Sequence, residues 1–295
     1  MKNVLYKAGL LTFAGALFMT QPQVASADAA EGDVIVTLGE DLTPKQKEDL
    51  LKEMNVDDKA LMVTVSNSEE HKYLDDYMPK AQIGTRSISS SKITISEAGA
   101  GLHVQSSNIN YVSDEMYLNA LTTAGVKDAE IYITAPFSVS GTAALTGITK
   151  AYEVSTGEEI PEEQKQIANE EMVKTAELAD QNGVGDDKAA AFMATVKEKI
   201  GEAKPETKEE VQAVIEDAAN TAGITLTETQ IEGYTDFFTR MKEMNIDWNV
   251  AKEQAAAMKE KFDNFIQSDE AKGMFEKIGD WFQTVIDTIS GWFGK

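Results

Sequence analysis

The fold is decided by residues 33–55, DVIVTLGEDLTPKQKEDLLKEMN, in which one hydrophobic period gives way to another. The first part, DVIVTLG, is rich in β-branched residues and alternates in the manner of a β-strand. The second part predicts a helix, because Thr43 can cap its first turn, Pro44 suits the first helical position and Gln46 completes a capping box. A strand that runs directly into a helix predicts helices packed on a sheet.

The same alternation of strands and helices continues to about Tyr152. Further strands are predicted in LMVTVSN and DAEIYITAPF, and helices in SEEHKYLDDYM and GTAALTGITKAYEV. The segment SDEMYLNALTTAG predicts a helix that is capped by Ser113 and ended by Gly125. The segment KITISEAGAGLHVQSSNINYV predicts two strands joined as a hairpin at the Gly99–Gly101 turn. Together these elements predict a mixed sheet with helices on it.

Strands are no longer expected after STGEEIPEEQ, and the rest of the chain has helical periodicity. Helices are predicted in PEEQKQIANEEMVKTAELADQ, DDKAAAFMATVKEKIGE, TKEEVQAVIEDAANTAG, TETQIEGYTDFFTRMKEM and DWNVAKEQAAAMKEKFDNFIQ. The predicted fold class is therefore α+β, with an N-terminal mixed-sheet α/β domain followed by an all-helical C-terminal region. We place the α/β domain at 28–156, the helical region at 157–270 and a C-terminal amphipathic aromatic helix at 271–295.

The N-terminus has the pattern of a cleaved secretory signal peptide, which we place at residues 1–27. Lys2 and Lys7 supply a positive start, AGLLTFAGALFM is apolar, and small residues follow at Ala25-Ser26-Ala27. The mature chain would begin at Asp28 or Ala30. The alternative is an uncleaved anchor, but the apolar run is short of the roughly 20 residues that span a membrane.

Composition limits the partners that this chain can have. Lys and Arg number 27 against 50 Asp and Glu, and the chain from Asp28 onward has 25 against 50, a net charge of −25. Such a chain is repelled by phosphate backbones, so we expect no nucleic-acid partner. The absence of cysteine excludes disulfides, thiol catalysis and Cys-based zinc sites, and secretion without disulfides suits a Gram-positive exporter.

Several segments together resemble one known family. GDVIVTLGEDLTPKQKEDLL, AQIGTRSISSSKITI, DEMYLNALTTAGVKDAEIYITAPFSVSGTAALTGITKAYE and MNIDW resemble the YpuA-like proteins. These form a family of unknown function that is secreted by Bacillus and related Firmicutes. The resemblance extends over nearly all of the mature chain and implies an exported, envelope-facing protein. It supplies no reaction, cofactor or catalytic residue.

Few residues are candidates for chemistry, and the chain has only two histidines. A metal-ligand interpretation of His71 would use Glu70 or Asp75, but charged helix faces usually only solvate. His103 lies on a predicted strand, where we expect a cross-strand neighbour rather than a ligand. Metal sites and catalytic triads usually draw on several such residues.

Two short motifs have structural alternatives. Ser89 and Lys92 have the S-x-x-K spacing of penicillin-interacting enzymes, but that serine begins a helix, whereas ITI follows here and predicts a strand. The turn that contains Pro136, Gly141 and Gly147 could present backbone N–H groups to an anion. We favour close helix-on-sheet packing by small residues, because the turn matches no phosphate-binding motif.

The segment DQNGVGDDK partly matches a calcium loop. Asp180, Asn182 and Gly185 occupy EF-hand positions, but Val184 and Ala191 stand where oxygen ligands are required. We expect a helix–helix turn with an Asp cap. Weak divalent cation binding remains as an alternative, through Asp180, Asp186 and Asp187.

The aromatic tail raises the question of what covers it. On a helix, the apolar side chains from Met274 to Phe293 share one face. Either that face docks on the protein's own helical region, or it contacts a membrane interface or a partner helix. IGDWFQTVIDTISGWFGK is similar to secreted surface-active peptides such as the staphylococcal delta-toxin. The expected contact residues are Phe275, Ile278, Trp281, Phe282, Val285, Ile289, Trp292 and Phe293.

The sequence assigns no catalytic, cofactor-binding or metal-ligating residue. The prediction is a secreted or cell-envelope-associated protein of a Gram-positive bacterium that acts as a non-enzymatic binding or structural module. The alternative is an envelope-directed hydrolase that uses carboxylate catalysis, although paired carboxylates are too frequent in this chain to identify a pair. An extracellular toxin or surfactant is a third interpretation.

Overall fold

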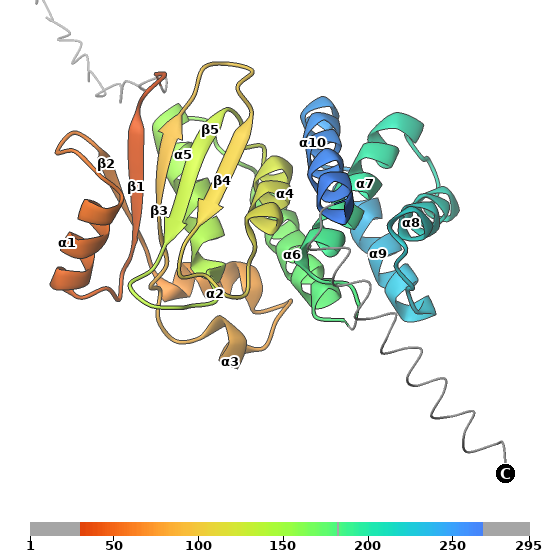
Figure 1. The fold of residues 1–295 in the computed structure, drawn as a ribbon, viewed down its shortest axis with the longest axis horizontal. Coiled ribbons are helices and arrows are strands. Elements are labelled where there is room, and N and C mark those ends of the chain that lie inside the picture. The colour runs from red at the N-terminus through yellow and green to blue at the C-terminus, as the bar shows by residue number, and fades with distance from the viewer. Residues whose placement is uncertain (1–29, 182, 268–295) are drawn as a thin grey trace, which may run out of the picture.

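A mixed five-stranded sheet forms the N-terminal half of the protein (Figure 1), in a computed structural model that describes residues 30–181 and 183–267. The strand order is β2-β1-β3-β5-β4. β1 runs parallel to β2 and β4 parallel to β5, while β3 is antiparallel to both of its neighbours. The strands are β1 (Val34–Gly39), β2 (Leu61–Val65), β3 (Ser90–Ile95), β4 (Leu102–Ser106) and β5 (Ala129–Thr134).

The predicted hairpin between β3 and β4 is wrong, because β5 lies between these two strands. The link that joins them binds the start of β5 at both of its ends. The Ser96 N–H donates to the Asp128 carbonyl at 2.8 Å, and the Gly101 N–H donates to the Asp128 carboxylate at 2.8 Å. The Gly99–Gly101 segment therefore carries the chain across β5 rather than turning it back on itself.

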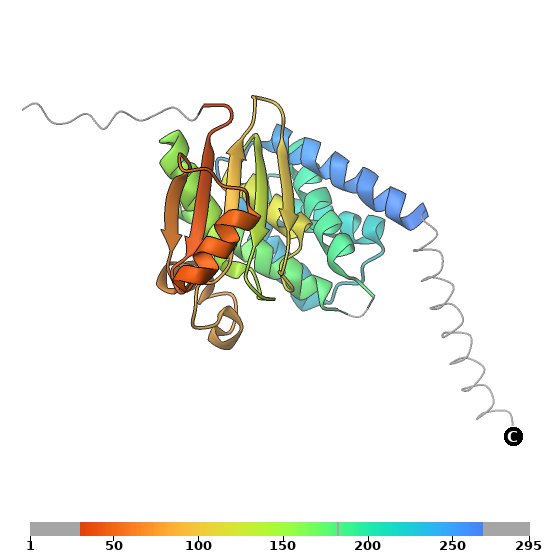
Figure 2. The ribbon, with the colours of Figure 1, turned by 60° about the vertical axis from the view of Figure 1, so that its left-hand side comes forward.

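Helices cover both faces of the sheet. α1 (Pro44–Glu53) starts with the predicted capping box at Thr43 and packs Leu50 against Val36 on one face. α4 (Asp114–Ala124) and α5 (Thr142–Thr156) cover the other face, and Figure 2 shows α1 on the opposite side from them. α4 has the predicted caps, Ser113 and Gly125. Two short helices, α2 (Asn67–Leu74) and α3 (Lys80–Ile83), connect β2 to β3.

The C-terminal half is helical in its described residues, as predicted. α6 packs on α4, and α10 packs on α7, so the helices continue outward from the sheet (Figure 1). α8 and α9 both begin with capping boxes, from Thr207 and Thr227. The helices are α6 (Glu162–Ala179), α7 (Asp186–Ala203), α8 (Lys208–Ala222), α9 (Glu228–Met241) and α10 (Trp248–Gln267). The α+β fold class is thereby confirmed.

One apolar core joins the sheet to the helices. It runs from Ile35 of the sheet to Phe238 of α9. The division of domains at residue 156 stays a prediction. The predicted signal peptide and the predicted aromatic helix lie outside the residues that the structure describes.

A buried ion pair lies where the two halves meet. Lys197 of α7 and Glu171 of α6 have side chains that are 1% and 0% exposed, and Lys197 Nζ lies 2.9 Å from Glu171 Oε1. Lys197 also donates to the Asn119 carbonyl of α4 at 2.9 Å, and the Thr123 hydroxyl donates to Glu171 at 2.5 Å. Burial lowers the pKa of Lys197, while the Glu171 carboxylate opposes that shift. The pair therefore ties α4 to α6 and α7.

Candidate ligand-binding cleft

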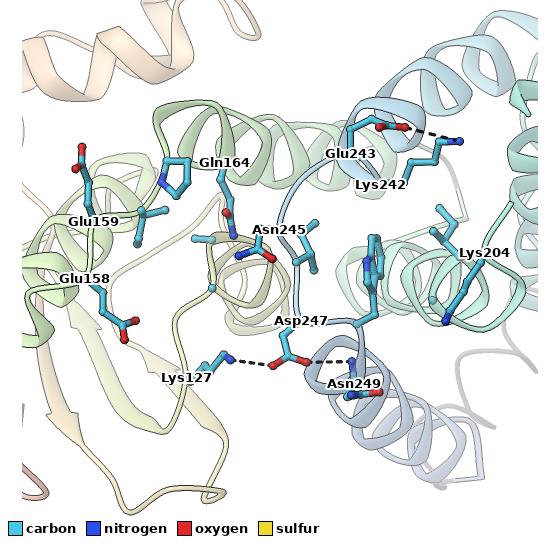
Figure 3. Close-up of a pocket in the computed structure, with 18 of the residues that line it drawn as sticks. Lys127, Glu158, Glu159, Gln164, Lys204, Lys242, Glu243, Asn245, Asp247 and Asn249 are labelled. Atoms are coloured by element: carbon cyan, nitrogen blue, oxygen red, sulfur yellow. Dashed lines mark hydrogen bonds and ion pairs between the residues drawn. The ribbon is translucent and has the colours of Figure 1, made fainter. Parts of the chain in front are cut away.

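A cleft of about 1060 Å³ opens where the sheet half meets the helical half (Figure 3). α4, α5, α7 and α9 end at this cleft, and α6 and α10 begin there. Its lining includes Lys127, Tyr152, Glu158, Glu159, Gln164, Gly201, Lys204, Glu206, Lys242, Glu243, Asn245, Asp247, Trp248 and Asn249. A recess of this volume lies at the upper end of the range of small-molecule sites.

Local sequence explains why so many helices end together. Gly125 and Gly157 adopt left-handed conformations that end α4 and α5. Lys204 is also left-handed, with φ of 48°, and Pro205 follows it after the end of α7. Asp247 caps α10 by accepting from the Asn249 N–H at 3.2 Å. Each helix end leaves carbonyl groups near the cleft, and such ends favour cations.

Two of the lysines in the cleft are held by the protein itself. Lys127 Nζ lies 2.8 Å from Asp247, and this ion pair crosses from the sheet half to α10 (Figure 3). The hydrogen bond from Lys127 lowers the pKa of Asp247, and the same contact raises the pKa of Lys127. Lys242 Nζ donates to the Pro205 and Glu206 carbonyls, each at 3.1 Å. These contacts fix the shape of the cleft.

Other polar groups in the cleft are free to bind a ligand. The side chains of Glu158, Glu159 and Lys204 are exposed and have no ion pair or hydrogen bond with any described residue. The Gln164 side chain is only 4% exposed and donates its amide N–H to the Thr123 carbonyl at 2.8 Å. Its oxygen can accept a hydrogen bond, and Figure 3 shows the amide directed into the cleft.

An aromatic wall completes the cleft. A Cβ atom added to Gly201 would lie 3.2 Å from the Trp248 Cβ and 3.6 Å from its ring, so the indole packs directly on the α7 backbone. Trp248 remains partly exposed, while Tyr152 is buried beside Lys127. Burial is the main cause that raises the pKa of Tyr152. The cleft therefore combines a flat apolar surface with charged groups of both signs.

The structure changes the prediction for one histidine and supports it for the other. His71 is more than a solvated surface residue, because its Nδ1 lies 2.5 Å from Asp75 and its Nε2 lies 2.9 Å from the Gly84 carbonyl. The hydrogen bond to Asp75 is the main cause that raises the pKa of His71. His103 is paired across strands with Glu130, as predicted.

The two short motifs are structural. Lys92 lies in β3 and donates to the Met54 carbonyl at 2.9 Å, so the predicted strand at this position is confirmed. At Gly141 an added Cβ would lie 2.3 Å from the Tyr117 hydroxyl, and at Gly147 it would lie 2.9 Å from Val65. Both glycines thus allow the close packing that we favoured.

The acidic segment between α6 and α7 is a helix–helix turn, but its predicted Asp cap is wrong. Gly185 occupies the N-cap position without a side-chain bond, and Asp186 and Asp187 lie in the first turn of α7. Burial, followed by the charge of Asp180, raises the pKa of Asp186. No group of three or more His, Asp or Glu residues that could hold a metal ion occurs in the described part of the chain. Weak cation binding here remains a prediction.

Sequence reasoning missed the cleft, although one signal was present. Gly, Pro or Lys residues stand at the ends of four predicted helices, but no local pattern indicates that these ends meet in space.

The tail residues expected to contact a membrane or partner, from Phe275 to Phe293, lie outside the described ranges. Within those ranges, no helix has the length and hydropathy needed to cross a membrane.

The fold and the cleft define an α+β protein in which a mixed sheet and a helical stack share one core and enclose a polar recess. This chain belongs to the family described as "Protein of unknown function (DUF1002)", which matches residues 38–258. It is 50% identical over 282 residues to the uncharacterized protein YpuA of Bacillus subtilis (strain 168), an overlap of 95% of this chain and 96% of that protein. The YpuA-like resemblance is confirmed. No solved structure gives a significant match.

Proposed function

We propose that this protein is an exported, non-enzymatic binding module whose ligand occupies the cleft. The observation that carries this proposal is the cleft itself, which is preformed between two halves that share a core. Its unpaired Glu158, Glu159 and Lys204 and its partly exposed Trp248 offer polar and apolar contacts to one ligand. Ligand sites are typically few, concave and largely preformed, with a small number of convergent polar groups.

The binding proposal is tested by thermal melts with three classes of probe. The probes are organic cations (spermine and tri-lysine), anions (inorganic phosphate and citrate) and a neutral sugar (chitotriose). A ligand that binds only the folded state raises the melting temperature in proportion to its occupancy. Asn245→Phe fills the cleft from an exposed position, and Asn220→Phe places the same side chain on an exposed position of α8.

At least one probe class should raise the melting temperature of the wild-type chain and of Asn220→Phe, but not that of Asn245→Phe. Binding that persists in Asn245→Phe would contradict the proposal, as would the absence of a shift with every probe at millimolar concentration.

The same proposal includes export and a contact made by the C-terminal tail, and both of these parts are supported by the sequence alone. The positive start, apolar run and small residues of segment 1–27 support secretion. The test is the N-terminal mass of the protein in the medium of a Gram-positive host, where a start at Asp28 or Ala30 is expected. Retention of Met1 in a cell-bound protein would contradict export by cleavage. The apolar face of segment 271–295 supports a contact with a membrane or a partner.

The alternative, an envelope-directed hydrolase, needs two carboxyl groups on opposite sides of a scissile bond. Glu158 and Glu159 are adjacent in sequence and lie on the same side of the cleft in Figure 3. Glu158 and Glu159 therefore do not form such a pair with each other.

A further inference from the structure

We infer that the ligand of the cleft is an organic polycation, a chain of primary ammonium or guanidinium groups such as a basic peptide or a polyamine. This inference rests on the proposed function and names the chemical class of its ligand. Its basis is the balance of charge and the orientation of the helices, which favour positive charge, together with one buried polar side chain whose oxygen accepts a hydrogen bond.

The cleft carries an excess of negative charge. Among its described lining residues, three lysines stand against five carboxylates, in a chain whose mature part has a net charge of −25. Two of the lysines are already held by the protein, Lys127 by Asp247 and Lys242 by backbone carbonyls. Among the lining side chains without an ion pair or hydrogen bond to a described residue, Glu158 and Glu159 stand against one lysine, Lys204. A cleft with an excess of one charge attracts the opposite charge and repels anions.

The ends of the surrounding helices add to the negative charge of the cleft. Four helices, α4, α5, α7 and α9, end at the cleft and two, α6 and α10, begin there, so the carbonyl ends outnumber the N–H ends and leave a net partial negative charge. The protein already places cations at these ends, because Lys242 donates to the Pro205 and Glu206 carbonyls just beyond α7. A ligand ammonium group would be stabilised in the same way.

Gln164 presents a hydrogen-bond acceptor to the cleft, independently of net charge. Its amide nitrogen donates to the Thr123 carbonyl at 2.8 Å, and the amide is directed into the cleft, where its oxygen can accept from a ligand. That oxygen can only accept a hydrogen bond, so a ligand atom that binds it must be an N–H or O–H donor. An ammonium or guanidinium group supplies one.

Trp248 adds a contact that distinguishes organic cations from metal ions. Its ring is held against Gly201 and stays partly exposed to the cleft. The face of an indole attracts ammonium and guanidinium groups, and it packs on the methylene groups that join them. Spaced cations on an apolar chain therefore match both the carboxylates and the indole.

Isothermal titration of the mature chain with spermine and with tri-lysine tests the inference. Glu158→Gln/Glu159→Gln should weaken binding roughly three- to thirtyfold, as expected for the loss of two exposed charge pairs. The matched control, Glu209→Gln/Glu232→Gln, removes the same charge from exposed positions outside the cleft and should change affinity less than about twofold. Binding of tri-lysine alone would identify a basic peptide as the source, and binding of spermine alone a polyamine.

Three results would overturn the inference. Equal weakening by the control variant would mean that polycations bind the general surface. Cleft binding by phosphate, citrate or chitotriose, without spermine or tri-lysine, would leave the proposed function intact and refute the ligand class. The absence of binding by every probe would refute both.

Discussion

Replacing Lys197 by methionine tests whether the buried ion pair ties the two halves together. The substitution keeps the length of the side chain but leaves Glu171, which is 0% exposed, without its counter-charge. Breaking a buried pair from one side costs about 3–5 kcal/mol, because a buried charge is left uncompensated. For a chain of this size that loss lowers the melting temperature by about 6–20 °C, at roughly 2–4 °C per kcal/mol.

Two further variants separate this account from a general effect of the substitution. Lys199→Met makes the same change on the same helix, in an exposed pair with Asp217, and should cost less than about 1 kcal/mol. Adding Glu171→Leu to Lys197→Met removes both charges and should recover part of the loss, because apolar replacements of buried pairs are often tolerated. Urea unfolding followed by circular dichroism gives the free energies. A loss below about 1 kcal/mol for Lys197→Met, or a double variant less stable than the single, would refute the reasoning.

Three other predictions concern pH, packing and the tail. Asp75 raises the pKa of His71, so the stability that His71 contributes is full below its unfolded pKa of about 6.5 and is lost as pH rises through its folded pKa. His71→Ala should therefore lower the melting temperature more at pH 5.5 than at pH 8.5, and an equal effect at both would contradict this. Gly147→Ala should destabilise by about 1–3 kcal/mol through overpacking, whereas Gly233→Ala, in open space within α9, should stabilise by about 0.5–1 kcal/mol in urea unfolding. If the tail contacts membranes, the mature chain should co-sediment with anionic or zwitterionic liposomes, and a chain truncated after Gly273 should not; equal pelleting would refute a membrane role for the tail.

Much of the fold was accessible from sequence because its determinants are local. Thr43, Ser113 and Gly125 mark helix ends through contacts within a few residues, and the structure places the caps where those residues predict them. The helices of the C-terminal half follow from apolar residues at helical spacing. The same local logic supported the interpretation of Gly141 and Gly147 as packing residues.

What the sequence did not predict depends on contacts between distant residues. β3 and β4 do not pair because β5 lies between them, and Asp128, which lies just before β5, binds both ends of their link. The cleft likewise depends on Lys127 meeting Asp247 and on Gln164 meeting Thr123. No periodicity or motif in the sequence indicates these contacts, so the site could be found only from the structure.

The most direct test of a ligand in the cleft uses Trp248 as its reporter. The chain has three tryptophans, so Trp281→Phe/Trp292→Phe leaves Trp248 alone, in the wall of the cleft. Titrating this protein with spermine and tri-lysine, followed by phosphate, citrate and chitotriose, reports binding at the cleft through its fluorescence. The account predicts a saturable change in emission with the cations, which Asn245→Phe abolishes and Asn220→Phe preserves. Unchanged emission with all five probes, or a change that survives Asn245→Phe, would contradict it.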